Sequence, residues 1–341
     1  MIVTKTFFLL LMRTVYVSQP GCYVSLHQEM LVIKKGESVL GEIQLPLLEQ
    51  LLIFGQSQVT TQAIRTCLWR NIPIAYLSRM GYCYGRILPL ERGYRQLSRY
   101  QQQLCFAERL QVARRIVQAK LKNSRVILMR QQRRQASDVI VFAIDCLEHL
   151  IKKAGEAETI EKLMGMEGAG AAQYFSAFEE CLSNPDFVFV GRSRRPPGNP
   201  VNAMLSFGYQ VLWNHLLSLI ELQGLDPYSA CLHQGTERHA ALASDLIEEF
   251  RAPIIDTLVF YLVNNGMMKA DQDFVFRNSG CFLNDSGRQK FLTAFLRRME
   301  EDFTNNSGDT QPKWDLLNQQ VKAFKQFVYN PLELYQPYQI R

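Results

Sequence analysis

The sequence lacks the features that mark several structural classes. Its eight cysteines include no C-x-x-C pair, which argues against a zinc ribbon and against a disulfide scaffold. Reduced thiols are the simplest interpretation, so we expect a cytoplasmic protein. The chain also has no internal repeat and no low-complexity tract. The apolar run from Phe7 to Met12 is too short for a membrane span or a signal peptide core, and Met12 remains an alternative start.

What the sequence does have is the composition of a globular protein longer than one average domain. Its 341 residues favour two domains, and its hydrophobic share of 47% and charged share of 21% are ordinary. A chain of this length can bury a sizeable hydrophobic core without disulfides or structural metal ions. The formal net charge of +6 is modest and does not by itself indicate a nucleic-acid partner.

The distribution of charge is more informative than its sum. Between Glu91 and Arg134 the sequence has ten arginines and two lysines against two glutamates. Such a stretch is typical either of a surface that contacts phosphates or of a solvated helical face, and composition leaves both alternatives open. The arginines are Arg92, Arg95, Arg99, Arg109, Arg114, Arg115, Arg125, Arg130, Arg133 and Arg134.

The first ninety residues carry the pattern of a small β-rich domain. Cys22, Val24 and Leu26 alternate with more polar neighbours, which is the period of a half-buried strand. A short helix is expected to begin near Thr60. Further strands are expected at residues 14–18, 31–33, 39–45, 74–77 and 82–87.

From about residue 91 the period changes to that of helices. One apolar stripe comprises Leu104, Ala107, Leu110 and Ala113, and another comprises Val139, Phe142, Cys146 and Leu150. Helices are expected over residues 137–153, 158–182, 200–223, 241–265 and 286–302. We therefore predict an α+β protein, with a small N-terminal β-rich domain at residues 1–90 followed by a larger all-helical catalytic domain at residues 91–341.

One acidic residue stands out within a segment of small residues. Glu167 is surrounded by glycine and alanine in the segment Leu163 to Phe175, and small neighbours let another backbone or a substrate approach closely. A single helical glutamate is more often a solvated surface residue. The glycines nevertheless cost helix stability, which indicates that something besides propensity maintains them.

A second acidic group follows a histidine. His233 lies in a loop, and a helix is expected to begin near Ala240. On that helix the apolar positions Leu242, Leu246 and Phe250 form one face, while three acids project from the other. The acids are Asp245, Glu248 and Glu249. Because like charges repel, acids gathered in this way either face water or share a cation.

A histidine with two or three carboxylates is a ligand set for Mg²⁺ or Mn²⁺. Carboxylate oxygens suit hard divalent ions, and one imidazole shifts the preference toward manganese. Such an ion neutralises a scissile phosphate and stabilises the attacking or leaving oxygen. Glu167 has to arrive from a different helix than Glu248, and spacing alone does not show that convergence.

A loop rich in proline and glycine lies between these two segments. It carries Arg192, Arg194 and Arg195, which form a plausible phosphate clamp, although loop arginines are usually just solvated. Pro200 then opens a helix with Asn199 as its expected N-cap.

Together the three segments resemble the signatures of a known family, the first CRISPR-associated protein, which is the integrase that inserts new spacers. The first signature, G-x-E-G-x-x-A-x-x-Y-F, is met by Gly165 to Phe175. The second, R-R-P-P-x-[DN]-P-V-N-x-x-L-S-F-G-Y, is met by Arg194 to Tyr209. The third, G-L-D-P-Y…L-H…S-L-A-L-D-L-x-E-E-F-R, is met by Gly224 to Arg251. The resemblance runs from about Arg13 to the C-terminus, and residues 1–11 have no counterpart in it.

The resemblance implies a function and a set of roles. Glu167, His233 and Glu248 would be the ligands of Mg²⁺ or Mn²⁺, with Asp245 orienting or supplementing the catalytic site. The family reaction is a transesterification in which the 3′-hydroxyl of a short DNA duplex, the prespacer, attacks a phosphodiester at the edge of a CRISPR repeat. Implied partners are double-stranded DNA, a second copy of the chain joined through the β-rich domain, and the second small protein of CRISPR adaptation. The basic stretch and the three loop arginines would contact phosphates.

Departures from the pattern are few, and rival interpretations remain. Ala241 and Ser244 replace the usual Ser and Leu before Asp245, and Ala169 stands where an Arg is common. One rival is a general metal-dependent nuclease on branched DNA or repair intermediates that does not integrate. Another is a DNA-binding protein with inactive acids. A third is a catalytic thiol at Cys231, against which a buried structural cysteine is the more common case.

Overall fold

The computed structural model describes residues 13–17, 19, 21–78, 82–90, 94–236, 239–304 and 310–340. The run from Phe7 to Met12 and Arg92 lie outside the described residues, as does the side chain of Arg95. The chain divides into two compact units. The first comprises Met1–Gln102 and Asn214–Asp226, and the second comprises Gln103–Trp213 and Pro227–Arg341. Among the described residues, no helix combines the length and the apolar character that a membrane crossing requires.

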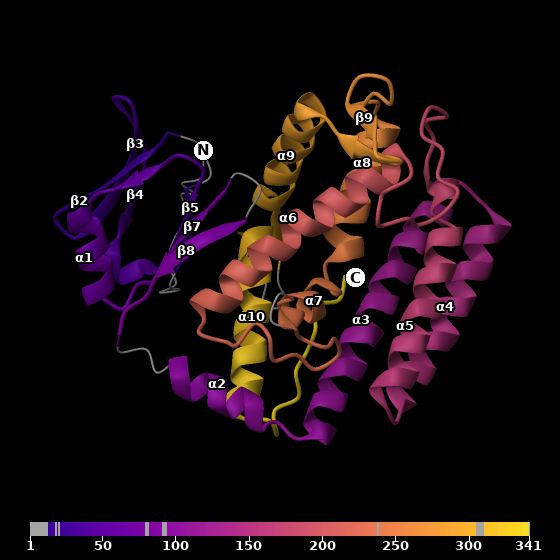
Figure 1. The fold of residues 1–341 in the computed structure, drawn as a ribbon, viewed down its shortest axis with the longest axis horizontal. Coiled ribbons are helices and arrows are strands. Elements are labelled where there is room, and N and C mark those ends of the chain that lie inside the picture. The colour runs from indigo at the N-terminus through magenta and orange to yellow at the C-terminus, as the bar shows by residue number, and fades with distance from the viewer. Residues whose placement is uncertain are drawn as a thin grey trace. The chain divides into compact units, whose positions relative to one another are not determined.

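The first unit is built on two four-stranded sheets (Figure 1). One has the order β1-β5-β7-β8, in which β1, β5 and β7 run parallel and β8 is antiparallel to β7. Its strands are β1 (Arg13–Val17), β5 (Leu48–Phe54), β7 (Ile74–Leu77) and β8 (Cys83–Ile87). The other has the order β4-β3-β2-β6. Its strands are β2 (Tyr23–His27), β3 (Met30–Lys35), β4 (Ser38–Gln44) and β6 (Gln58–Val59).

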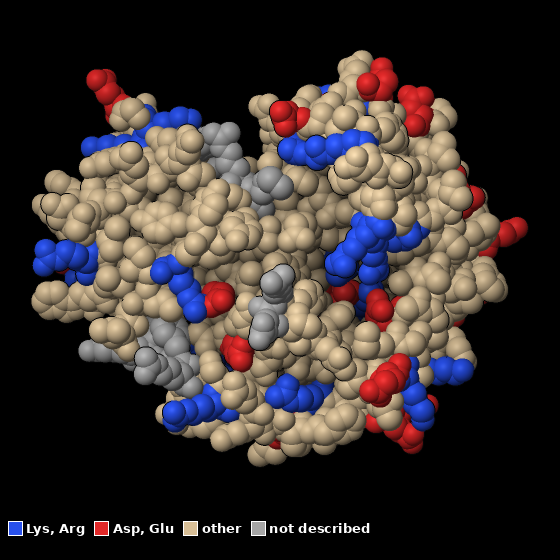
Figure 2. All heavy atoms as spheres, in the orientation of Figure 1, with Lys and Arg blue, Asp and Glu red and all other residues tan. Residues whose placement is uncertain are grey.

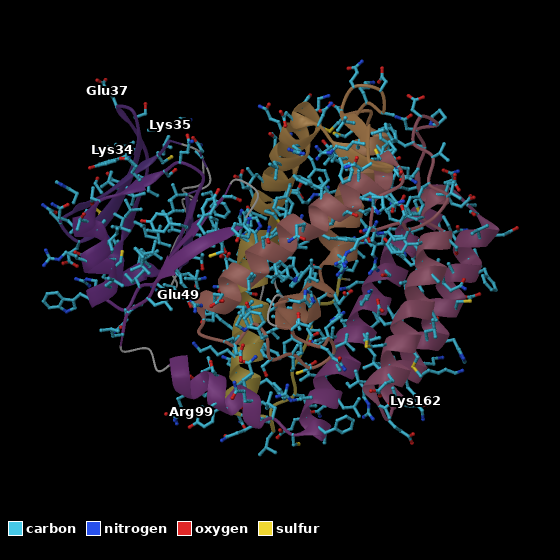
Figure 3. The ribbon with its side chains drawn as sticks, in the orientation of Figure 1. Lys34, Lys35, Glu37, Glu49, Arg99 and Lys162 are labelled. Carbon is cyan, nitrogen blue, oxygen red and sulfur yellow. The ribbon has the colours of Figure 1, made fainter. Side chains whose placement is uncertain are left out.

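The second sheet has a charged hairpin tip, and short helices connect its strands to the first sheet. The β3–β4 hairpin tip carries Lys34, Lys35 and Glu37, which point away from the sheet into solvent (Figure 3). Between the strands, the short 3-10 helix η1 (Leu45–Leu47) leads into β5, and α1 (Thr61–Trp69) follows β6. The hydroxyl of Thr60 accepts the Ala63 amide at 3.2 Å, which confirms the helix start expected near Thr60.

Strand β5 is the longer of two strands of this unit that the sequence pattern did not indicate, the other being β6. Six of its seven residues are buried, including Leu51, Leu52 and Ile53, and it lies between β1 and β7 in the sheet. A central parallel strand is covered on both faces, so it reads as a continuous apolar run rather than as an alternation.

The second unit is mainly helical. Its long helices α3 (Phe106–Gln132), α4 (Asp138–Glu156) and α5 (Ile160–Ser176) lie side by side (Figure 1). Helix α2 (Tyr94–Gln103), which belongs to the first unit up to Gln102, precedes α3, and the 3-10 helix η2 (Glu179–Cys181) follows α5. Helix α6 (Pro200–Leu222) starts in this unit, and the Asn199 side chain accepts the Asn202 amide at 2.8 Å, which confirms its expected N-cap. The remaining helices are α7 (Ala241–Ile247), the π-helix η3 (Arg251–Asp256), α8 (Thr257–Asn264), α9 (Asp285–Glu300) and α10 (Lys313–Tyr329).

Several details of the helical prediction were wrong. The helix expected over residues 241–265 is divided into α7, η3 and α8, and the helix expected over residues 158–182 ends at Ser176. The second unit is not all-helical, because it contains the hairpins β9–β10 (Phe274–Arg277, Gly280–Leu283) and β11–β12 (Asp302–Thr304, Thr310–Pro312). The stripe predicted on α4 faces outward, with Val139 and Phe142 44% and 62% exposed. The buried residues of α4 are Ile140, Ala143, Leu147 and Ala154, because this helix carries apolar side chains on more than one face.

The glycines of α5 differ in their surroundings. A Cβ atom built on Gly170 would lie 2.2 Å from Cδ2 of Leu121, so α3 approaches the backbone of α5 closely here. A Cβ atom on Gly165 or Gly168 would meet nothing within 4 Å. Packing of α3 therefore explains Gly170, while Gly165 and Gly168 leave the backbone beside Glu167 open.

This difference predicts opposite effects for two substitutions on one helix. Gly168→Ala should raise the free energy of unfolding by up to about 1 kcal/mol, because alanine favours helix and fills open space. The free energy of unfolding of Gly170→Ala should be about 1–3 kcal/mol lower than that of Gly168→Ala, because the buried Leu121 side chain has to shift to make room for the new Cβ atom. Urea denaturation of both variants measures the difference, and equal effects would contradict the close approach of α3.

Candidate active site

Asp245 on α7 organises the loop that carries His233. Its side chain is fully buried, and Oδ2 accepts the amides of Cys231 and Leu232 at 2.7 and 2.9 Å. Its Oδ1 accepts the amide of His233 at 2.9 Å and lies 2.8 Å from Nδ1 of the same residue. A carboxylate at Nδ1 favours the tautomer that carries its proton there, which leaves Nε2 of His233 as the basic nitrogen.

The electrostatics of His233 follow from this contact. Burial lowers the pKa of the imidazole, but the hydrogen bond and charge of Asp245, together with the charge of Glu248, outweigh burial and raise it above the ordinary value. The raised pKa of His233 is therefore due to the negative charges of Asp245 and Glu248. Asp245 uses both of its oxygens within the protein, so its geometry suits the orienting role rather than that of a ligand.

Glu167 and Glu248 meet at one lysine ammonium. Lys120 of α3 forms ion pairs with Oε1 of Glu167 on α5 and, at 2.6 Å, with Oε2 of Glu248 directly after α7. Arg251 lies 3.1 Å from the other oxygen of Glu248. Burial raises the pKa of Glu248, but the charges of Arg251 and Lys120 outweigh it and bring it to about 2. Glu248 is therefore ionised at neutral pH although only 4% of its side chain is exposed.

The solvated-face interpretation of the three acids on this segment is wrong. Asp245, Glu248 and Glu249 are all buried. They also do not gather together, because Asp245 holds the His233 loop, Glu248 pairs with Lys120 and Arg251, and Glu249 contacts the C-terminal segment. Three buried acids on one short segment thus have three separate environments.

A metal ion is compatible with this donor set, but the ligand roles stay a prediction. Within the described part of the chain, no three His, Cys, Asp or Glu side chains are arranged so that they could hold a metal ion. Two carboxylates from different helices nevertheless converge on a single positive charge, and the ordered imidazole of His233 interacts with one of them. Hard oxygen donors and one imidazole nitrogen suit Mg²⁺ or Mn²⁺, which would replace the Lys120 ammonium between the acids.

A buried aspartate behind the acids was missed by the sequence reasoning. Asp256 accepts hydrogen bonds from the hydroxyls of Tyr174 and Tyr209 at 2.9 and 2.5 Å. Burial raises its pKa to about 6, against the lowering effect of the two tyrosines and of nearby arginines. The guanidinium of Arg251 lies 4.6 Å from the centre of the Tyr209 ring, so this network reaches Glu248 through Arg251. Lys120, Arg194, Arg251 and Asp256 all line one small cavity of about 20 Å³.

The three loop arginines have different surroundings. Arg192 donates to the side chains of Asn202 and Ser206 at 2.8 and 3.0 Å, and it lies 5.6 Å from the Tyr209 ring centre. Its guanidinium therefore fastens the loop to α6. Arg194 and Arg195 are exposed. Their predicted contact with phosphates, like that of Arg192, stays a prediction.

Several arginines of the basic stretch hold the second unit together. Arg109 donates to the carbonyl of Ala230 at 2.7 Å, Arg114 to that of Ala157 at 2.6 Å, and Arg115 to that of Tyr335 at 3.3 Å. Arg125 pairs with Glu148 at 2.6 Å. The exposed members are Arg99, Arg130, Arg133 and Arg134. Neither alternative drawn from composition included internal hydrogen bonds, and for the described exposed members phosphate contact stays a prediction.

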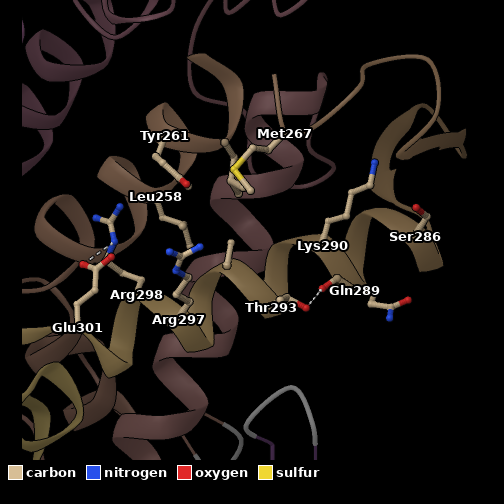
Figure 4. Close-up of a pocket in the computed structure, with 12 residues that line it drawn as sticks. Leu258, Tyr261, Met267, Ser286, Gln289, Lys290, Thr293, Arg297, Arg298 and Glu301 are labelled. Carbon is tan, nitrogen blue, oxygen red and sulfur yellow. Dashed lines mark hydrogen bonds and ion pairs between the residues drawn. The ribbon is translucent and has the colours of Figure 1, made fainter. Parts of the chain in front are cut away.

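Two other features do not belong to this site. Cys231 is buried, and burial together with Asp245 raises the pKa of its thiol, so it is a poor nucleophile. A larger pocket of about 660 Å³ is bordered by α8 and α9, with Tyr261, Lys290, Arg297 and Arg298 among its lining residues (Figure 4). None of the predicted site residues lines it.

Over the helical unit, Figure 2 shows a group of Lys and Arg side chains with acidic side chains directly beside it.

Comparison with known proteins places these residues in a family. Residues 15–297 match the family model described as CRISPR associated protein Cas1. The chain belongs to the Cas1 family. The matched residues include all three signature segments, two of which carry Glu167, His233 and Glu248.

Curated Cas1 relatives agree with this assignment. The chain is 36% identical over 299 residues to the CRISPR-associated exonuclease Cas4/endonuclease Cas1 fusion of Geobacter sulfurreducens, with 85% of this chain and 53% of the relative covered. It is 30% identical over 343 residues to CRISPR-associated endonuclease Cas1 1 of Chlorobaculum tepidum, with 96% and 98% covered. The chain thus spans about half the length of the fusion relatives it matches, which are 53% and 57% covered.

Solved structures share the fold. A chain of a partial Cas6-RT-Cas1–Cas2 complex has a TM-score of 0.83 at 23% identity, with 96% of this chain and 98% of that chain covered. A casposase bound to an integration product has a TM-score of 0.73 at 22% identity, with 96% and 100% covered.

The shared ammonium generates a prediction about stability. Lys120→Met should lower the free energy of unfolding in the absence of divalent ions by up to about 3–5 kcal/mol, because the partly buried Glu167 loses its ion pair and the buried Glu248 keeps Arg251 alone. Lys122→Met, two residues along α3 and without an ion pair among the described residues, is the matched control and should cost under about 1 kcal/mol. Thermal and urea unfolding of both variants measure this, and equal costs would contradict the role of Lys120.

Proposed function

We propose that this chain is a metal-dependent DNA endonuclease and integrase that inserts short DNA fragments as new spacers into a CRISPR array. The observation that supports it most is the convergence of Glu167 and Glu248, from different helices, on one cation beside an imidazole oriented by Asp245. Membership of the Cas1 family supplies the context in which such a site acts on DNA. Glu167, His233 and Glu248 are the proposed ligands of Mg²⁺ or Mn²⁺, and these residues with Asp245 are the proposed catalytic group.

The divalent ion, when bound, would neutralise the scissile phosphate and stabilise the attacking or leaving oxygen. The chain's own residues do the positioning. Asp245 holds the His233 ring with Nε2 as its free basic nitrogen, and Arg251 keeps Glu248 ionised in a buried position. The open backbone at Gly165 and Gly168 lets a duplex approach the acids.

The proposed partners follow from the relatives. Solved neighbours include a Cas6-RT-Cas1–Cas2 complex and a casposase with its integration product, and both share this fold. For this chain we propose double-stranded DNA, namely prespacer and CRISPR repeat, as substrate. We also propose a homodimer through residues 1–90, a catalytic and DNA-binding domain at residues 91–341, and a complex with the second small protein of CRISPR adaptation.

The alternative function is a general metal-dependent nuclease on branched DNA or repair intermediates. It requires the same site, and the curated relatives are themselves described as endonucleases. The two functions differ in whether a 3′-hydroxyl or a water molecule attacks the phosphodiester.

Strand joining into a repeat-bearing plasmid tests the function and the site together. Purified protein with its small partner and Mg²⁺ or Mn²⁺ should join a short duplex. Glu167→Ala and His233→Ala should each lower the rate by at least about 100-fold, because each removes a proposed ligand. Glu161→Ala on the same helix α5, exposed and in its first turn, should leave the rate unchanged. Cleavage without joining would favour the alternative nuclease, and full activity of both variants would contradict the site.

The loop arginines generate a separate prediction about DNA affinity. Arg195→Ala should weaken binding equally for all duplex sequences and reduce the slope of log affinity against log salt by about 1, because it removes one phosphate contact. Arg192→Ala should instead lower the free energy of unfolding by about 1–3 kcal/mol, because Asn202, which keeps the Ser193 amide, and Ser206 each lose a charged donor. Salt-dependent binding titrations and melting curves separate the two effects, and an unchanged salt slope for Arg195→Ala would contradict the phosphate clamp.

A further inference from the structure

The C-terminal segment, residues 335–340, contacts the residue that follows Glu248. Glu249 is fully buried, and its carboxylate accepts three hydrogen bonds. The Tyr335 hydroxyl donates to Oε1, while Gln320 Nε2 and the Tyr338 amide donate to Oε2 at 2.7 and 2.6 Å. Two of these three donors belong to the C-terminal segment, so Glu249 fastens that segment to the end of α7.

Asn123 of α3 also connects Glu249 to the C-terminal segment. Its Nδ2 donates to the carbonyl oxygens of Glu249 and Tyr338 at 2.8 and 3.0 Å, and its Oδ1 accepts the Ile340 amide at 3.0 Å. Asn123 follows Lys120 by three residues, so both side chains lie on one face of α3. One face of α3 therefore holds the side chain of Glu248 and the backbone of Glu249.

The peptide between these residues lies at a break in regular helix. Helix α7 ends at Ile247, and the π-helix η3 begins at Arg251. In the junction the amides of Glu248 and Phe250 donate three residues back, to Asp245 and Ile247 at 3.2 and 2.9 Å. Such a junction lacks the support of continuous i→i−4 bonds, so its conformation depends on side-chain contacts.

The junction directs its side chains to two different environments. Glu248 and Arg251 face the candidate active site and pair with each other. Glu249 and Phe250 face the C-terminal segment, and Phe250 stacks on Tyr338 with ring centres 5.6 Å apart. Whatever holds Glu249 and Phe250 in place also fixes where the carboxylate of Glu248 points.

We propose that Glu249 and Tyr335 are positioning residues for Glu248, and that the C-terminal segment thereby forms part of the site. This inference rests on the proposed function, in which Glu248 binds the divalent ion. Glu249 acts through hydrogen-bond geometry. A glutamine at this position keeps that geometry, because its carbonyl accepts from Gln320 and Tyr338 while its NH₂ group donates to the Tyr335 oxygen.

The test compares four single-substitution variants of the whole chain with the unsubstituted protein. Glu249→Ala and Tyr335→Phe remove the contact in whole and in part, and Glu249→Gln is the conservative variant. Asn284→Ala is the stability control, because Asn284 caps α9 by accepting the Gly287 amide at 2.9 Å in the same unit and contacts none of the site residues. The measurements are the dissociation constant of Mn²⁺, from the paramagnetic resonance of free ion, and kcat and KM for strand joining and cleavage.

We expect Glu249→Ala to weaken Mn²⁺ binding and lower kcat by about 10–100-fold with KM for DNA unchanged, as for partners that orient metal ligands. Tyr335→Phe should act in the same direction by a smaller factor, and Glu249→Gln should stay within about threefold of the unsubstituted protein. If Glu249→Ala does not fold, Tyr335→Phe decides the question.

Several outcomes would overturn the inference. The inference would be wrong if Tyr335→Phe and Glu249→Ala had the same Mn²⁺ affinity and the same kcat as Asn284→Ala, because Glu249 and Tyr335 would then have no positioning role. Glu249→Gln as impaired as Glu249→Ala would exclude hydrogen-bond geometry as the cause. Unsubstituted protein that binds Mn²⁺ but yields no DNA product would contradict the proposed function alone, because the Mn²⁺ affinities still report on positioning. Unsubstituted protein that binds no Mn²⁺ would contradict both.

Discussion

The candidate site depends on the balance of charge around two carboxylates, one buried and one partly buried. Glu248 and Glu167 both pair with the Lys120 ammonium, and Arg251 pairs with Glu248 as well. Without a cation, two carboxylates gathered at one ammonium would repel each other, most strongly where water is excluded. This requirement for positive charge is consistent with the proposed divalent ion, because an ion at this position would neutralise the same two carboxylates as the lysine.

The acids nearby differ in what neutralises or solvates them. Asp245 accepts backbone amides and the His233 ring, Asp256 accepts two tyrosine hydroxyls, and Glu249 accepts donors from the C-terminal segment. Acids whose oxygens are fully used by the protein can orient other residues but have little capacity left for an ion. Glu167 and Glu248, paired only with side-chain cations, retain that capacity.

The sequence predicted the candidate residues better than their environments. Two of the three motifs carried Glu167, His233, Asp245 and Glu248, and the structure brings two of these residues to one cation and two into direct contact. Lys120 was hidden in a basic stretch whose residues look alike in sequence but differ in the structure. Some, such as Arg114, bond to internal carbonyls, whereas Arg133 and Arg134 face solvent. Composition does not distinguish these roles, because the partner of each arginine lies far away along the chain.

The sequence by itself determined the order of β-rich and helical regions, the approximate bounds of several elements and the family, because these depend on local periodicity, capping residues such as Thr60 and Asn199, and continuous motifs. Only the tertiary structure decided that β5 is a central strand, that Val139 and Phe142 face outward, and that Glu249 contacts residues 335–340 rather than the acids beside it. Those outcomes depend on which surfaces cover each other. Burial and charge pairing between segments far apart in sequence are set by packing of the whole unit and not by any local pattern.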